Sequence, residues 1–146
     1  MTSVPVFSQN REQLRRMYRE AWRKYNARLP LEPLQAQIAT VIAEHKEYVP
    51  LLESGSQALS ADFPPEAGRE NPFLHMGLHL AIREQVATDR PRGIAQIHRA
   101  LSQRLGDPHA AEHAMLEPLA ETLWESQRSG QIPDEQRYLE RLRALA

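Results

Sequence analysis

The sequence predicts an all-α protein, an antiparallel up-and-down bundle of about four core helices with one or two further helices packed outside. Three observations support this fold class. Apolar residues recur at spacings of three and four along most of the chain. No segment alternates apolar and polar residues over the length of a strand. Prolines and glycines divide the chain into segments of helical length, which short helix connections would join into a bundle.

Length, composition and charge exclude several classes of protein. The 146 residues fit one domain spanning 1–146. The absence of cysteine excludes disulfides, iron–sulfur clusters and thiolate zinc sites. A net charge of −1 gives no long-range attraction to nucleic acid, so we expect no nucleic-acid partner. No window approaches the ~20 apolar residues of a membrane span, and the N-terminal segment lacks an apolar signal core. We therefore expect a cytoplasmic protein without a membrane partner.

The first predicted helix starts at one of two capping residues, Ser8 or Asn10, and ends before Pro30. Its apolar stripe is made by Leu14, Met17, Tyr18, Ala21, Trp22 and Tyr25. Basic residues also gather on this helix, and we interpret them as a solvated face: Arg11, Arg15, Arg16, Arg19, Arg23 and Lys24.

The second predicted helix begins at Pro33 and should be ended by Pro50. It carries His45 near its C-terminal end on the apolar side, with Glu44 at the edge of that stripe. Residues 54–70 are rich in glycine, proline and small polar residues, so we expect a long loop, either a connector or a lid over a site.

The third predicted helix, from Phe73 to about Thr88, follows a cap at Asn71. His75 and His79 lie four residues apart on its apolar face, which is an unusual environment for two imidazoles. The residues DRPRG then break the helical pattern.

The fourth predicted helix, 94–105, has His98 on its apolar side. Gly106 should end it, and Asp107 should cap the next helix, which begins at Pro108. That fifth helix ends at Gly130. Its predicted inward face consists of His109, His113, Leu116, Ala120, Leu123 and Gln127, with Glu117 and Trp124 beside it.

Two features near the C-terminus complete the pattern. Pro118 lies inside the fifth helix, so either the helix kinks there or one helix stops and another begins. Asp134 caps a last helix whose docking face is made by Tyr138, Leu139, Leu142 and Leu145.

The histidines should converge at one end of the bundle. If the core helices alternate in direction, a rise of ~1.5 Å per residue brings His45, His79 and His113 to nearly one depth, with Glu44 beside them. His75 and His109 lie about a turn above this level. About a turn below it lie Glu84, Glu117 and His98, whose role the sequence leaves open.

Such a cluster predicts a metal site, because buried imidazoles need hydrogen-bond partners or a cation. Imidazoles with nearby carboxylates suit zinc, iron, nickel or manganese. One metal would use three or four of the residues at the common depth, and a second metal would add Glu84 or Glu117 as a bridge. The candidate metal ligands are His45, His75, His79, His109, His113, Glu44, Glu84 and Glu117.

Three functions fit these residues. The first is a metal-binding bundle of unknown reaction. The second is a non-enzymatic interaction protein with a buried histidine network, acting through its first or last helix. The third is a metal-dependent enzyme, because HxxxH at His75 with HxxxE at His113 is similar to hemerythrins and to the DinB-like group. The absence of HExxH, GxSxG and phosphate-loop motifs disfavours the common hydrolases and nucleotide enzymes. The sequence leaves open a homo-oligomer and whether the protein is an enzyme.

Three segments of the chain together carry a resemblance to a known family: NPFLHMGLHLAIREQ, DRPRGI and HAAEHAMLEPLAETLWESQRSG. They resemble an uncharacterised bacterial family, domain of unknown function 1841. The resemblance covers most of the chain from the first predicted helix to the fifth. It implies a helical fold and candidate positions, but no reaction.

Overall fold

The computed structural model describes the backbone of residues 4–54 and 71–146, and the side chains from residue 11 onward within those ranges. All regular structure in these ranges is helical, which confirms the all-α class. The elements are α1 (Val4–Asn26), α2 (Pro33–Ala43), the 3₁₀ turn η1 (Lys46–Tyr48), α3 (Val49–Leu52), α5 (Pro72–Thr88), α6 (Ile94–Leu105), α7 (Pro108–Ser129) and α8 (Glu135–Leu145).

The chain forms two compact units, Met1–Met76 and Gly77–Ala146. The division falls inside helix α5, whose first turn belongs to the first unit and whose remainder belongs to the second. The predicted single domain and the predicted up-and-down order of the whole bundle remain predictions.

In the first unit, α1 packs against α2, and the start of α5 contacts α1. The ring of Tyr18 meets that of Phe73 edge to face, with centroids 5.7 Å apart. The guanidinium of Arg15 lies 4.7 Å from the centroid of the same Phe73 ring, and Arg15 is only 2% exposed. The interpretation of Arg15 as part of a solvated basic face was therefore wrong, because its long side chain covers an aromatic ring.

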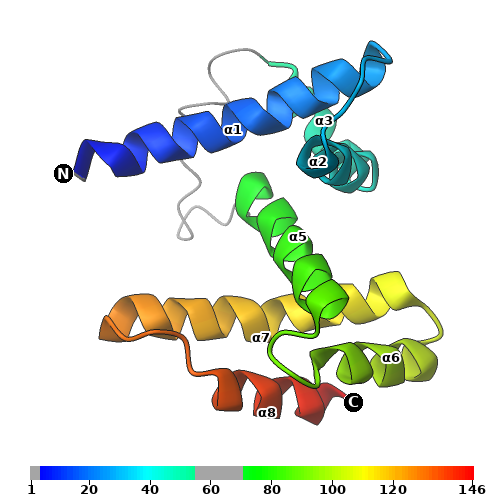
Figure 1. Ribbon diagram of the computed structural model, residues 1–146, viewed down its shortest axis with the longest axis vertical. Coiled ribbons are helices and arrows are strands. Elements are labelled where there is room, and N and C mark those ends of the chain that lie inside the picture. The colour runs from blue at the N-terminus through cyan, green and yellow to red at the C-terminus, as the bar shows by residue number, and fades with distance from the viewer. Residues whose placement is uncertain (1–3, 55–70) are drawn as a thin grey trace. The chain divides into compact units, whose positions relative to one another are not determined.

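In the second unit, α7 lies along both α6 and α8 (Figure 1). Its core also includes Leu78 and Ile82 from α5. The other buried core members are Ile94, Ile97, Leu101, Ala111, Met115, Leu116, Leu119, Tyr138, Leu139 and Leu142. A hydrogen bond of 2.7 Å from the Tyr138 hydroxyl to Gln85 joins α8 to α5.

The connection between α6 and α7 is as short as the sequence predicts. Gly106 ends α6 in a left-handed conformation, with φ at 78°, and its amide donates to the Ser102 carbonyl. Asp107 then caps α7 by accepting hydrogen bonds from the amides of His109 and Ala110. Two residues thus reverse the chain, because each satisfies backbone groups that a helix end leaves unpaired.

Helix boundaries confirm most of the predicted elements. α5, α6, α7 and α8 match the expected segments, and α7 runs through Pro118 as one helix. The prediction that Pro50 ends the second helix was wrong. α2 already ends at Ala43, and Pro50 lies in the first turn of α3, where its missing N–H is no loss.

Two further expectations concern the chain as a whole. Among the described residues, no helix is both long enough and apolar enough to cross a membrane. The predicted loop or lid at 54–70 lies almost entirely outside the described residues.

Candidate metal centre

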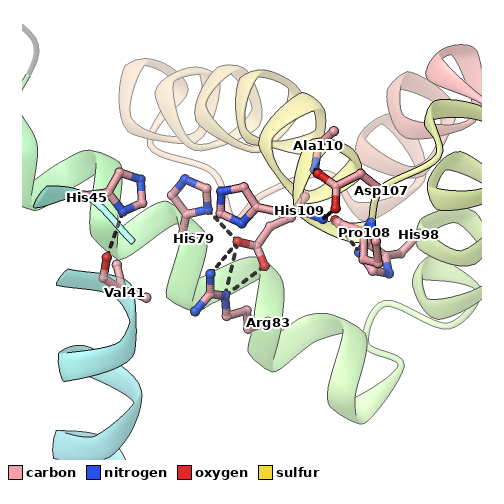
Figure 2. A network of polar contacts seen from close by, with 10 residues as sticks. Val41, His45, His79, Arg83, His98, Asp107, Pro108, His109 and Ala110 are labelled. Atoms are coloured by element: carbon pink, nitrogen blue, oxygen red, sulfur yellow. Dashed lines mark hydrogen bonds and ion pairs between the residues drawn. The ribbon is translucent and has the colours of Figure 1, made fainter. Parts of the chain in front are cut away.

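His45 is placed by the end of helix α2. Glu44 caps the helix in a helical conformation, and His45 then leaves it with φ −127° and ψ 63°. The imidazole turns back so that Nδ1 lies 2.8 Å from the Val41 carbonyl (Figure 2). A carbonyl oxygen can only accept, so Nδ1 must carry the hydrogen. In the neutral ring the lone pair is therefore at Nε2.

His75 packs against His45 within the first unit. Their ring centroids are 5.0 Å apart in an edge-to-face arrangement, and both side chains are buried. The ring of Tyr48 stacks on His45 at 5.5 Å and meets His75 at 6.1 Å. Two histidines thirty positions apart in the sequence are thus brought together in an aromatic environment.

His79 follows His75 by four residues on the continuous helix α5, so the two imidazoles share one helix face. Its side chain is fully buried. One ligand nitrogen from each of His45, His75 and His79 lies within 4.8 Å of the others. We call these residues the histidine triad. Since metal–nitrogen bonds are ~2.0 to 2.1 Å long, small side-chain rotations would let the triad hold one ion.

Within the second unit, the buried carboxylate of Glu112 orients His79. Its Nδ1 lies 2.5 Å from Oε2 of Glu112, and the same carboxylate accepts from Nε of Arg83 at 2.8 Å (Figure 2). Burial opposes ionisation of Glu112, but the hydrogen bonds from His79 and Arg83 outweigh it and lower the pKa to about 2. The ionised carboxylate can only accept, so Nδ1 of His79 donates and its neutral ring also has the lone pair at Nε2.

Two exposed histidines of α7 lie against His79. The His109 ring is stacked at a centroid distance of 5.7 Å and an angle of 8°, and the His113 ring is tilted at 5.6 Å. Helix geometry explains why both reach His79, because residues four apart project from one face.

The inward face predicted for α7 was wrong. The buried residues of this helix are Ala111, Glu112, Met115, Leu116, Pro118, Leu119 and Thr122. His109, His113, Leu123 and Gln127 are exposed instead. Leu116 belongs to both the predicted inward face and the buried face of α7. These two faces differ by a small rotation about the helix axis, and the apolar residues alone do not distinguish them.

The remaining candidate ligands lie outside the triad. Glu44, Glu84 and Glu117 are exposed. The Nε2 of His98 lies 3.2 Å from the Pro108 carbonyl, so this side chain links α6 to the start of α7. The group of buried imidazoles that could hold an ion consists of His45, His75 and His79. The common depth of His45, His79 and His113 stays a prediction.

Sequence reasoning missed Glu112 and Arg83. A signal was available in both cases. Glu112 precedes Met115 and Leu116 by three and four positions, which puts a carboxylate on the apolar face of its helix. Arg83 follows His79 by four positions, so it lies on the same face of α5 as the histidines.

Comparison with known proteins gives a family but no function. No curated protein and no solved structure matches this sequence. One family model, described as domain of unknown function (DUF1841), matches residues 10–144, nearly the whole chain. The chain therefore belongs to the DUF1841 family, which confirms the resemblance predicted from the sequence.

Proposed function

We propose that this protein binds one divalent transition-metal ion through the histidine triad. The observation that carries the proposal is the convergence of three buried imidazoles, two of them with Nδ1 used as a donor. Metal-binding histidines usually donate their second ring nitrogen to a carbonyl or carboxylate, which fixes the ring and raises its basicity. Val41 and Glu112 supply those two acceptors for His45 and His79.

The ligand set indicates the class of metal. Three imidazole nitrogens suit zinc, nickel or iron better than magnesium or calcium, which prefer oxygen. Manganese is less favoured than the sequence suggested, because the three predicted carboxylates are exposed rather than grouped with the triad. Three protein ligands also leave a coordination position for water or a substrate, as in catalytic zinc sites.

Native mass spectrometry of the untagged, full-length protein tests this proposal. The protein is exposed separately to zinc, nickel, iron and manganese ions and then freed of excess metal. We expect one bound equivalent of at least one ion. An ion that binds only the folded state would also raise the free energy of unfolding. The gain is about 2.7 kcal/mol at a free metal concentration a hundred times Kd.

The second candidate function is a histidine network without metal. Its supporting observation is that His45 and His79 each already have a protein acceptor, which lowers the cost of burial without a cation. Only trace metal with every ion, together with an unchanged melting temperature, would contradict the metal proposal and favour this one.

A further inference from the structure

Two exposed imidazoles of α7, those of His109 and His113, lie outside the histidine triad. We call them the surface histidine pair. Both are exposed, and they lie four positions apart on a helix of 22 residues. Imidazoles at this spacing stand about 5 to 6 Å apart at their Cβ atoms. They can therefore bind one transition-metal ion from a single helix face.

The surface histidine pair lies directly beside one member of the histidine triad. The ring of His79 is 5.7 Å from that of His109 and 5.6 Å from that of His113, measured between centroids. His79 is fully buried, whereas the two surface rings are exposed. An ion held by the surface histidine pair would thus lie next to the buried ring of His79.

Local charge makes the surface histidine pair a weak binder. His109 is in the first turn of α7, where the helix dipole is positive and opposes a cation. The carboxylate of Asp107 already accepts hydrogen bonds from the backbone amides of His109 and Ala110. An ion bound by two exposed ligands at this end of the helix should therefore exchange rapidly.

We propose that the surface histidine pair captures the divalent ion from solution and passes it to His79. This inference rests on the proposed metal site at the triad. Capture raises the local concentration of the ion next to a buried ligand, so it speeds loading. It leaves the affinity of the loaded triad unchanged, because neither surface histidine belongs to the triad.

Stopped-flow loading with cobalt(II) tests the inference. Metal-free, full-length protein is mixed with cobalt(II), and the absorption of the coordinated ion is followed with time. We expect the double variant His109→Ala/His113→Ala to load about tenfold more slowly, because it loses the raised effective concentration of the ion beside His79. His98→Ala, which also removes a histidine from the second unit, is the matched control and should load at the wild-type rate.

Equilibrium titration separates the inference from the metal site itself. The double variant should keep one equivalent of cobalt(II) with wild-type affinity. An unchanged loading rate in the double variant would overturn capture while leaving the triad intact. Loss of the bound equivalent in the double variant would also overturn it, because the surface histidines would then be permanent ligands. If the wild-type protein binds neither cobalt(II) nor any of the four ions used in the native mass spectrometry, the triad proposal fails and capture fails with it.

Discussion

The imidazole of His79 donates its Nδ1–H to the buried carboxylate of Glu112 across 2.5 Å. Arg83 donates to both oxygens of that carboxylate, with contacts of 2.8 to 3.1 Å. The pairing fixes the orientation of His79 and keeps Glu112 ionised. Glu112 is therefore important for a site to which it contributes no ligand atom, because it holds the ligand His79 in place.

Replacing Glu112 by glutamine should weaken metal binding without abolishing it. The amide keeps the shape of the side chain but loses the charge that raises the basicity of His79. Losing such a partner usually costs about 10- to 100-fold in affinity. Competition with a chromophoric chelator measures the change. Glu117→Gln, on the exposed face of the same helix, should keep wild-type affinity, and equal affinities for all three proteins would contradict the role of Glu112.

The stability of the metal-free protein should depend on pH through Glu112. Its folded-state pKa is lowered from 4.5 to about 2, so the unfolded chain binds more protons between these values. The stabilisation from the ionised carboxylate is fully present above pH 4.5 and is lost as pH falls toward 2. Urea unfolding at pH 6 and pH 3 measures this effect. The stability difference between wild type and Glu112→Gln should shrink at pH 3, and a constant difference would contradict the assignment.

The turn between α6 and α7 should depend on the conformation of Gly106. A Cβ at this position would meet no atom within 4 Å, so only the positive φ of 78° opposes a side chain. Gly106→Ala should therefore lower the free energy of unfolding by about 1 kcal/mol, the usual cost of a left-handed conformation in a non-glycine residue. Asparagine tolerates this conformation, so Gly106→Asn should cost less in the same chemical denaturation experiment. Equal stability of the three proteins would contradict this account.

The sequence predicted the helices better than their faces. The limits of α6 and α7 follow from Gly106, Asp107 and Pro108, whose local chemistry decides where helices stop and start. The end of the second helix was predicted wrongly at Pro50, because a proline can follow the end of one helix or lie in the first turn of the next. Capping residues and prolines predicted which segments are helical. They did not predict whether a helix ends at a given proline or a new helix starts there.

The residues of the candidate site were also predicted only in part. His45, His75 and His79 were predicted as ligands because each follows a clear apolar stripe, and all three are buried. His113 was assigned inward because the apolar residues of α7 fit two faces. Glu112 was overlooked because a carboxylate on an apolar face looks unfavourable until its partners, His79 and Arg83, are known. Such partners come from another helix, so single-helix periodicity cannot supply them.

The choice between His75 and His113 as the third ligand can be tested at equilibrium. His75 is buried, and one of its nitrogens lies within 4.8 Å of ligand nitrogens of His45 and His79, whereas His113 is exposed beside the ring of His79. His75→Ala should therefore lose the stoichiometric metal, because two remaining imidazoles hold an ion far less tightly than three. His113→Ala should keep one equivalent, since its side chain is outside the triad. Native mass spectrometry with zinc measures both variants after circular dichroism has confirmed their helical content. The opposite pattern, with metal retained by His75→Ala and lost by His113→Ala, would favour the common depth of His45, His79 and His113 that alternating helices predict.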